Sequence, residues 1–314
     1  MRTLRALFGG ILDYAGLFPP AALEMRPMVE RYAQAVSGPD AWFVGRVIVP
    51  VSRLKEFEEC AKGHLPVTKD ALNAPVWRLS ALGPPLWDGQ LERALEAIDA
   101  FNDRHADSLD GAAVIDTLEC KAGSSEQIDE ALDRIPEEIF PYFELPVFKD
   151  VRGMVASMAG LDAGAKVRTG GVTPEEHPTS EQLADFIVAC AGGEVPFKAT
   201  AGLHHPLRHL NQAVPADQFG CVGVMLGAAL LWNDRIDGKG IREILEERDA
   251  GAFRFDAESA SWRGHRLSHA ELLTARERFA HAFGSCSIDE PLDHFRHFGW
   301  LRGEPGATKE PSHA

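Results

Sequence analysis

Two short segments of the chain each place a lysine after an apolar run. Residues 165–171 read AKVRTGG and residues 195–205 read VPFKATAGLHH, so small residues and glycine follow both Lys166 and Lys198. A lysine that points into an apolar interior loses hydration, and a second cation nearby lowers its pKa further. A neutral amine can attack a carbonyl carbon and form a Schiff base. The two segments therefore predict a covalent lysine site.

Further polar residues follow other apolar runs and are candidates for binding the substrate. A guanidinium such as that of Arg168 can hold a carboxylate with two hydrogen bonds. Histidines near these runs can act as acids or bases. The set expected to bind substrate is Arg168, Glu144, Asp13, Thr169, Gly170, His204 and His205. The lysines can instead form structural ion pairs with Glu119 and Glu144, and spacing alone does not separate the two interpretations.

Strand periodicity predicts which of these side chains share a face. Side chains alternate along a strand, so Lys166 and Arg168 should point to the same side. The same rule places Asp116 with Leu118 and sends Glu119 to the opposite face, unless a bulge intervenes. We expect one shared pocket formed by Asp116, Glu144, Lys166, Arg168, Lys198 and His204.

Short apolar runs alternate with amphipathic segments along most of the chain, which is typical of βαβ units. Ser124 or Ser125 and Thr179 or Ser180 are candidate N-caps of two of the helices between the runs. The predicted strands are residues 10–13, 43–50, 76–82, 112–118, 139–145, 165–169, 196–200 and 221–226. This pattern predicts an α/β fold of the TIM (β/α)8 barrel type. A doubly wound open sheet is the alternative, although no glycine-rich nucleotide-binding motif accompanies it.

The character of the sequence changes after Asp234. Residues 1–234 are predicted to form the barrel, and residues 235–303 to form a mainly helical extension with a hairpin near Phe253, Phe255 and Trp262. Residues 304–314 are expected to be a disordered tail. The extension is interpreted as an appendage that covers one face of the barrel or joins two copies into a homodimer.

Composition limits the classes of partner and compartment. The net charge of −15 argues against nucleic acid or an anionic membrane as partner. Five cysteines form no CxxC pair, which favours free thiols in a reducing compartment, the cytoplasm. No signal peptide or membrane span is expected from the apolar runs. The expected partner is a small carbonyl compound.

Several strand segments resemble those of deoxyribose-phosphate aldolases, in the same order. AKVRTGG is similar to the family's Schiff-base strand (vKTSTGf), and PFKATAG is similar to its second lysine strand (vKASGG). AAVIDTLECKA, residues 112–122, is similar to the strand that carries the catalytic aspartate. The resemblance implies a class I aldolase in which Lys166 is the nucleophile, Lys198 lowers its pKa and Asp116 takes part in proton transfer. It implies no cofactor.

Two departures from the family pattern affect the expected substrate. The family's eighth strand ends in a Gly-Thr-Ser-Ser type loop that binds phosphate, whereas the predicted eighth strand here continues as GVMLGAALLW. Arg168 is also foreign to the pattern. We therefore expect a carboxylated substrate rather than a phosphorylated one.

Two alternative functions remain open at this point. Glu119, Glu144 and His204 or His205 could bind a divalent metal in a barrel lyase or hydrolase, with a lysine as base. A non-catalytic barrel that binds a metabolite is the other alternative, and it predicts salt-bridged, unreactive lysines.

Overall fold

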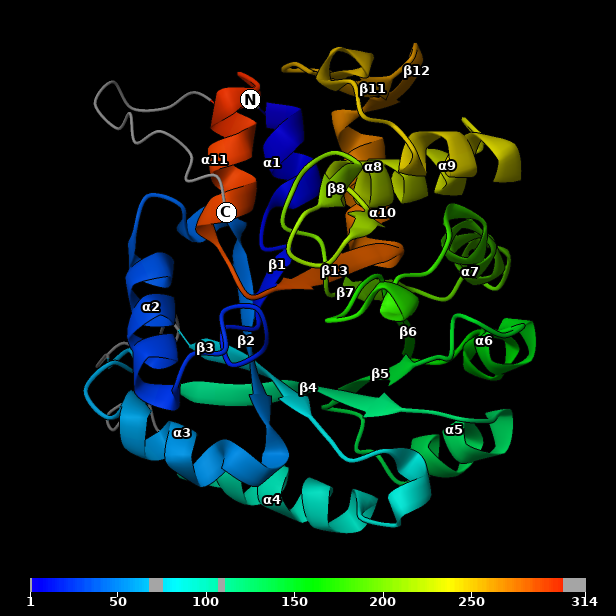
Figure 1. The fold of residues 1–314 in the computed structure, drawn as a ribbon. Coiled ribbons are helices and arrows are strands. Elements are labelled where there is room, and N and C mark those ends of the chain that lie inside the picture. The colour runs from blue at the N-terminus through cyan, green and yellow to red at the C-terminus, as the bar shows by residue number, and fades with distance from the viewer. Residues whose placement is uncertain (1, 68–75, 107–110, 302–314) are drawn as a thin grey trace.

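A closed barrel of eight parallel strands forms the centre of the molecule (Figure 1). The computed structural model describes residues 2–67, 76–106 and 111–301, so the predicted tail 304–314 lies outside it. Around the barrel the strands follow the order β1-β13-β7-β6-β5-β4-β3-β2. Their bounds are β1 (Leu12–Tyr14), β2 (Val44–Pro50), β3 (Trp77–Leu82), β4 (Ala113–Lys121), β5 (Phe140–Glu144), β6 (Gly164–Arg168), β7 (Phe197–Thr200) and β13 (Ala280–Ser285). The TIM barrel prediction is confirmed, and the open sheet is excluded.

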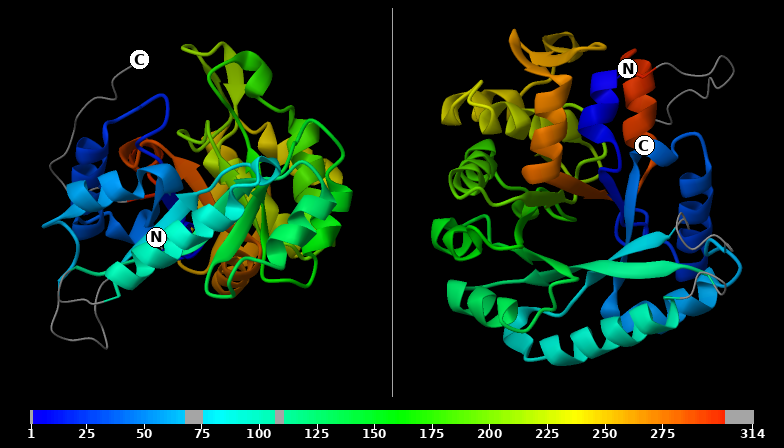
Figure 2. Two further views of the ribbon diagram at one scale, coloured as in Figure 1. Left: turned by 90° about the horizontal axis from the view of Figure 1, so that it is seen from below. Right: turned by 180° about the vertical axis from the view of Figure 1, so that it is seen from behind.

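Helices surround the barrel, as two further views show (Figure 2). Ser124 and Thr179 cap two of them, each accepting a hydrogen bond from the first-turn backbone. The helices are α1 (Arg2–Phe8), α2 (Met25–Ser37), α3 (Leu54–Ala61), α4 (Leu91–Arg104), α5 (Ser125–Leu132), α6 (Arg152–Met158), α7 (Ser180–Gly192), α8 (Cys221–Trp232), α9 (Gly238–Leu245), α10 (His269–Arg278) and α11 (Asp289–His297). Short 3-10 turns span Ala41–Phe43, Val51–Arg53, Leu86–Asp88, Pro174–Glu176 and Ala250–Ala252.

The predicted eighth strand at residues 221–226 is wrong, because this segment begins helix α8. A short run that is apolar at every position fits a buried helix as well as a buried strand, and periodicity does not separate them. Helix α8 is buried from Cys221 to Leu230. The eighth strand is β13, which pairs with β7 on one side and β1 on the other.

The barrel therefore does not end at residue 234, and residues 235–303 are not an appendage. This region supplies β13, without which the barrel would stay open between β7 and β1. The first and last helices are neighbours, with the rings of Phe8 and Phe295 5.0 Å apart between centroids. The hairpin region forms a separate antiparallel sheet of β10 (Phe253–Phe255), β11 (Ser259–Trp262) and β12 (His265–Ser268). A smaller sheet pairs β8 (His209–Asn211) with β9 (Ala216–Gln218).

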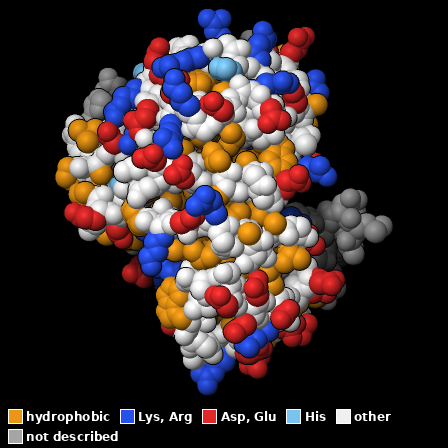
Figure 3. Space-filling view, turned by 90° about the vertical axis from the view of Figure 1, so that its right-hand side faces the viewer, with side chains coloured by type: hydrophobic (Ala, Val, Ile, Leu, Met, Phe, Trp, Pro, Cys, Tyr) orange, Lys and Arg blue, Asp and Glu red, His pale blue; other side chains and the backbone are white. Residues whose placement is uncertain are grey.

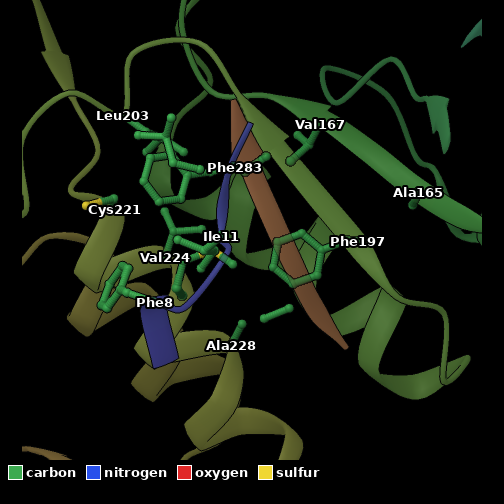
Figure 4. Close-up of a cluster of buried hydrophobic side chains, with 14 of the residues drawn as sticks. Phe8, Ile11, Ala165, Val167, Phe197, Leu203, Cys221, Val224, Ala228 and Phe283 are labelled. Carbon is green, nitrogen blue, oxygen red and sulfur yellow. The ribbon is translucent and has the colours of Figure 1, made fainter. Parts of the chain in front are cut away.

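The outer side of β6 and β7 packs against the helices. Ala165, Val167 and Phe197 belong to an apolar layer that also contains Val224 and Ala228 of α8 (Figure 4). Because successive side chains on a strand point to opposite faces, Lys166 and Lys198 must point into the barrel. The lysines thus lie where a barrel normally holds branched apolar side chains.

The helical face formed by α5, α6, α7 and α9 carries a mixture of acidic and basic side chains (Figure 3). Apolar side chains occur between them rather than in one continuous area. Within the described ranges, no helix is both long and apolar enough to cross a membrane.

Candidate active site

A buried network of two lysines and three carboxylates fills part of the barrel interior. Lys166 Nζ lies 2.7 Å from Glu119 Oε2 and 2.9 Å from Glu144 Oε2. Lys198 Nζ lies 2.5 Å from both Glu119 Oε1 and Asp13 Oδ2. Glu119 therefore bridges the two ammonium groups with its two oxygens.

The strand register explains why the lysines are neighbours. Lys166 pairs with Lys198 across β6 and β7, and Glu144 pairs with Lys166 across β5 and β6. Asp13 comes from β1, and its second oxygen accepts the backbone N–H of Arg46 at 2.8 Å. Five residues from five strands thus meet inside one barrel: Asp13, Glu119, Glu144, Lys166 and Lys198.

Glu119 points into the barrel because β4 contains a bulge. Leu79 pairs with Ile115 and Ser80 pairs with Thr117, so Asp116 is the extra residue on β4. A bulge shifts every later side chain to the opposite face. The hydroxyl of Ser80 donates a hydrogen bond of 2.5 Å to Glu119 Oε1. Ser80 is thus the third hydrogen-bonding partner of the Glu119 carboxylate, beside the two lysines, and Glu119 is only 1% exposed.

The charges of the network favour ionised groups. Burial alone lowers the pKa of Lys166, but the charges and hydrogen bonds of Glu119 and Glu144 outweigh it and raise that pKa. Burial likewise raises the pKa of Glu119, whereas the two ammonium groups lower it well below its usual range. Lys166 is therefore a cation in the resting protein.

This result corrects the expectation that Lys198 makes Lys166 neutral. The sequence places the second cation correctly but does not reveal that three carboxylates accompany the two lysines. Opposite charges within hydrogen-bond distance stabilise the protonated amine. The contacts are also those expected of the structural ion pairs that spacing alone could not exclude.

Asp116 does not reach the lysines. Arg46 donates two hydrogen bonds to its carboxylate, at 2.6 and 2.9 Å, and Arg78 lies 3.4 Å away. The expectation that Asp116 shares a pocket with the two lysines is therefore wrong. The bulge is the reason, because it gives the lysine-facing position to Glu119 instead.

The residues at the end of β6 and directly after it make different contacts. Arg168 is exposed at the end of β6, where its guanidinium donates to Gly170 O at 3.4 Å. The Thr169 hydroxyl donates to Ala201 O at 2.5 Å and is buried. A side chain at Gly170 would approach the Gly202 Cα to 3.3 Å. Thr169 and Gly170 thus hold two loops together instead of lining an open pocket.

The two predicted histidines do not contact the lysine network. His204 Nδ1 lies 2.7 Å from Glu290 Oε2, and its Nε2 lies 3.8 Å from Cys286 Sγ. The His205 ring packs against His209 and His294 at centroid distances of 4.7 and 4.1 Å. Neither histidine therefore joins Glu144 in the expected pocket.

The proposed metal ligands are not brought together. Glu119 and Glu144 both contact Lys166, whereas His204 contacts Glu290. In the described ranges of the chain, no group of three or more histidine, cysteine, aspartate or glutamate side chains is arranged to hold a metal ion.

Sequence reasoning missed two partners inside the barrel. Ser80 contacts Glu119, and the Tyr142 hydroxyl donates to His281 Nδ1 at 2.7 Å. The ring centre of Tyr142 lies 5.8 Å from Lys198 Nζ, within the range of a cation–π contact. The signal for Tyr142 was its alternation with Glu144 on one strand, whereas nothing in the sequence indicated the β13 residue His281.

Acidification should destabilise the protein because buried histidines resist protonation. Burial, with a contribution from Arg276, lowers the pKa of His281 to about 4, and burial with neighbouring histidines lowers that of His205 to about 4. The unfolded chain then binds more protons between about pH 4 and the ordinary histidine pKa of about 6.5. This part of the free energy of unfolding is complete above about pH 6.5 and decreases as the pH falls.

The variant His281→Gln should show a shallower fall in thermal unfolding temperature than the wild type across this acidic range. His265→Gln is the matched control, because His265 is exposed and should keep the wild-type slope. An unchanged slope in His281→Gln would contradict the assignment.

The expected absence of hydroxyls after the eighth strand is wrong, since it was inferred from the segment that forms α8. The true eighth strand, β13, ends at Ser285, and the chain reads GSCS over residues 284–287. Ser285 Oγ donates to Ser287 O at 2.9 Å and accepts the Ser287 N–H at 3.2 Å. These hydroxyls are therefore used within the loop, and Asp289 and Glu290 begin the helix that follows.

Comparison of the chain with known protein families, characterised proteins and solved structures found no match.

Proposed function

We propose that the protein is a class I, aldolase-like lyase in which Lys166 forms a Schiff base with a small carbonyl compound. The observation that carries the proposal is the pair of lysines in register on β6 and β7, joined by one buried carboxylate. Lys166 is the reacting amine, because it is 5% exposed whereas Lys198 is completely buried. The resemblance of both lysine strands to deoxyribose-phosphate aldolases supports the same assignment.

Glu144 is the proposed proton acceptor. Its carboxylate lies 2.9 Å from Lys166 Nζ and is more exposed than that of Glu119. In the proposed step the ammonium group gives a proton to Glu144, and the free amine attacks the carbonyl carbon. Glu144 then returns the proton to the carbinolamine hydroxyl, which leaves as water. The products are a protonated imine on Lys166, one water and ionised Glu144.

Lys198 and Glu119 are proposed to hold the site electrostatically. Asp13 and Glu119 both contact Lys198, so its charge is matched before substrate arrives. When Lys166 loses its proton, Lys198 continues to neutralise Glu119. This arrangement limits the energetic cost of a neutral amine beside a buried carboxylate.

The proposed substrate carries a carboxylate rather than a phosphate. Arg168 is on the same face of β6 as Lys166 and lies toward the carboxyl end, where barrel enzymes bind substrates. Asp289 and Glu290 begin the helix after β13, and their charges would repel a phosphate dianion there.

Borohydride reduction in the presence of carbonyl compounds tests the proposal. The protein is incubated with pyruvate, acetaldehyde or dihydroxyacetone phosphate, reduced, digested and mapped by mass spectrometry. We expect a reduced adduct on the Lys166 peptide, formed fastest with pyruvate. An adduct found only at exposed lysines would contradict the proposal.

A non-catalytic barrel is the second candidate, and the ion pairs of both lysines favour it. In that case the charged network serves only to fill and define the interior of the barrel. The same experiment distinguishes the two functions, because a purely structural Lys166 would give no adduct with any of the three compounds.

A further inference from the structure

A cysteine, a histidine and a glutamate form a connected series outside the lysine network. Cys286 Sγ lies 3.8 Å from His204 Nε2, and His204 Nδ1 lies 2.7 Å from Glu290 Oε2. With the Nδ1 proton donated to Glu290, the free Nε2 can accept the thiol proton. This is the arrangement of nucleophile, base and orienting carboxylate that activates a cysteine.

Three separate segments bring these residues together. Cys286 follows β13 directly, His204 lies in the loop after β7, and Glu290 is in the first turn of α11. Because β7 and β13 are paired neighbours, their carboxyl ends place Cys286 and His204 side by side. Cys286 is 8% exposed, and the His204 side chain is 17% exposed. The series thus lies on the side of the barrel where barrel enzymes carry their active sites.

Cys286 also lines a cavity of about 380 Å³. This volume falls in the range of small-molecule sites. Its walls include the apolar residues Pro20, Ala21, Leu23 and Ile288, together with Tyr14 and Arg31. Arg31 forms an ion pair with Asp289, which also lines the cavity. Ser287, Asp289 and Glu290 also line it, so the cavity offers an apolar wall for a short acyl chain and polar groups beside the thiol.

We propose that Cys286, His204 and Glu290 form a second reactive site, in which the thiol accepts an acyl group from a small ester with a short apolar acyl chain. The electrostatics of His204 agree with this geometry. Burial lowers its pKa, but the contacts with Cys286 and Glu290 outweigh burial and raise the pKa to about 9. A protonated imidazole beside the sulfur favours the thiolate, which is the nucleophilic form.

The proposed reaction is ester hydrolysis through a thioester. The Cys286 thiolate attacks the ester carbonyl, the C–O bond to the alcohol breaks, and His204 gives its proton to the departing alcohol. Water then attacks the thioester while His204 takes one of its protons. The thioester C–S bond then breaks and the acid is released, which leaves the Cys286 thiolate beside protonated His204, so the site regains its starting state without another reactant.

Acylation of the full-length protein by p-nitrophenyl acetate tests this site. We expect a burst of p-nitrophenolate and an acetyl group on the Cys286 peptide of the unmodified chain. The burst should be absent in Cys286→Ser. In His204→Gln the acylation rate should fall by about 100-fold or more, the effect of losing a general base. Peptide mapping separates this acetyl group from any on a lysine.

Cys60→Ser is the matched control, because Cys60 is more exposed than Cys286 but has no place in this series of residues. It should keep the wild-type burst. Acetylation of Cys60 as fast as Cys286, or an unchanged rate in folded His204→Gln, would overturn the proposal. Cys286→Ser should retain any borohydride adduct on Lys166, so failure of one site does not imply failure of the other.

Discussion

Replacing Lys166 by arginine should abolish borohydride trapping while the protein remains folded. Arginine keeps a positive charge between Glu119 and Glu144, but its guanidinium stays protonated and does not act as a nucleophile. Without a nucleophilic amine at this position no Schiff base can form. Any aldol cleavage or condensation should therefore be lost as well. Peptide mapping and circular dichroism of the same sample measure both parts of this expectation.

Lys121→Arg is the control for this experiment. Lys121 Nζ lies 3.9 Å from Glu144 Oε1, but the Lys121 side chain is exposed and lies outside the buried network. It should keep both trapping and turnover. Lys198→Arg should retain some trapping, because a cation remains beside Glu119. Normal turnover in Lys166→Arg would show that this amine is not the nucleophile.

The rate of trapping should also increase with pH. The pKa of Lys166 is raised, so most molecules carry an ammonium group at neutral pH and cannot attack a carbonyl. Raising the pH increases the neutral fraction until the raised pKa is passed. A trapping rate that falls from neutral to alkaline pH in a folded sample would contradict the requirement that Lys166 lose its proton before it attacks the carbonyl.

Replacing Glu119 by glutamine should cause the largest loss of stability of any single change in the network. The amide cannot balance the ammonium groups of Lys166 and Lys198, each of which loses one of two carboxylate contacts. Removing one partner of a buried ion pair costs about 3–5 kcal/mol in the free energy of unfolding. Urea unfolding of the variant and the wild type measures the difference.

Glu56→Gln provides the comparison for an exposed pair. Glu56 contacts Arg53 at 2.7 Å on the surface, where an ion pair contributes little to stability. We expect nearly wild-type unfolding for this variant. If Glu119→Gln unfolded at the same urea concentration as Glu56→Gln, the buried network would not stabilise the barrel.

The sequence by itself determined the class of fold and the positions of most strands. Apolar runs separated by amphipathic segments predict β1 to β7 because each run has strand length and each intervening segment has helical spacing. The caps Ser124 and Thr179 mark two of the helix starts by the same local chemistry. The inward direction of Lys166 and Lys198 also follows from simple alternation along their strands.

Only the tertiary structure decided which strand closes the barrel and which groups surround the lysines. An all-apolar segment such as Cys221–Trp232 satisfies burial as a helix or a strand, so closure by β13 depends on pairing between distant segments. The bulge at Asp116 likewise depends on the register with β3, and it moves Glu119 into the interior. Because a pKa reflects neighbours in space, the ionised state of Lys166 was settled by these long-range pairings and not by its local sequence.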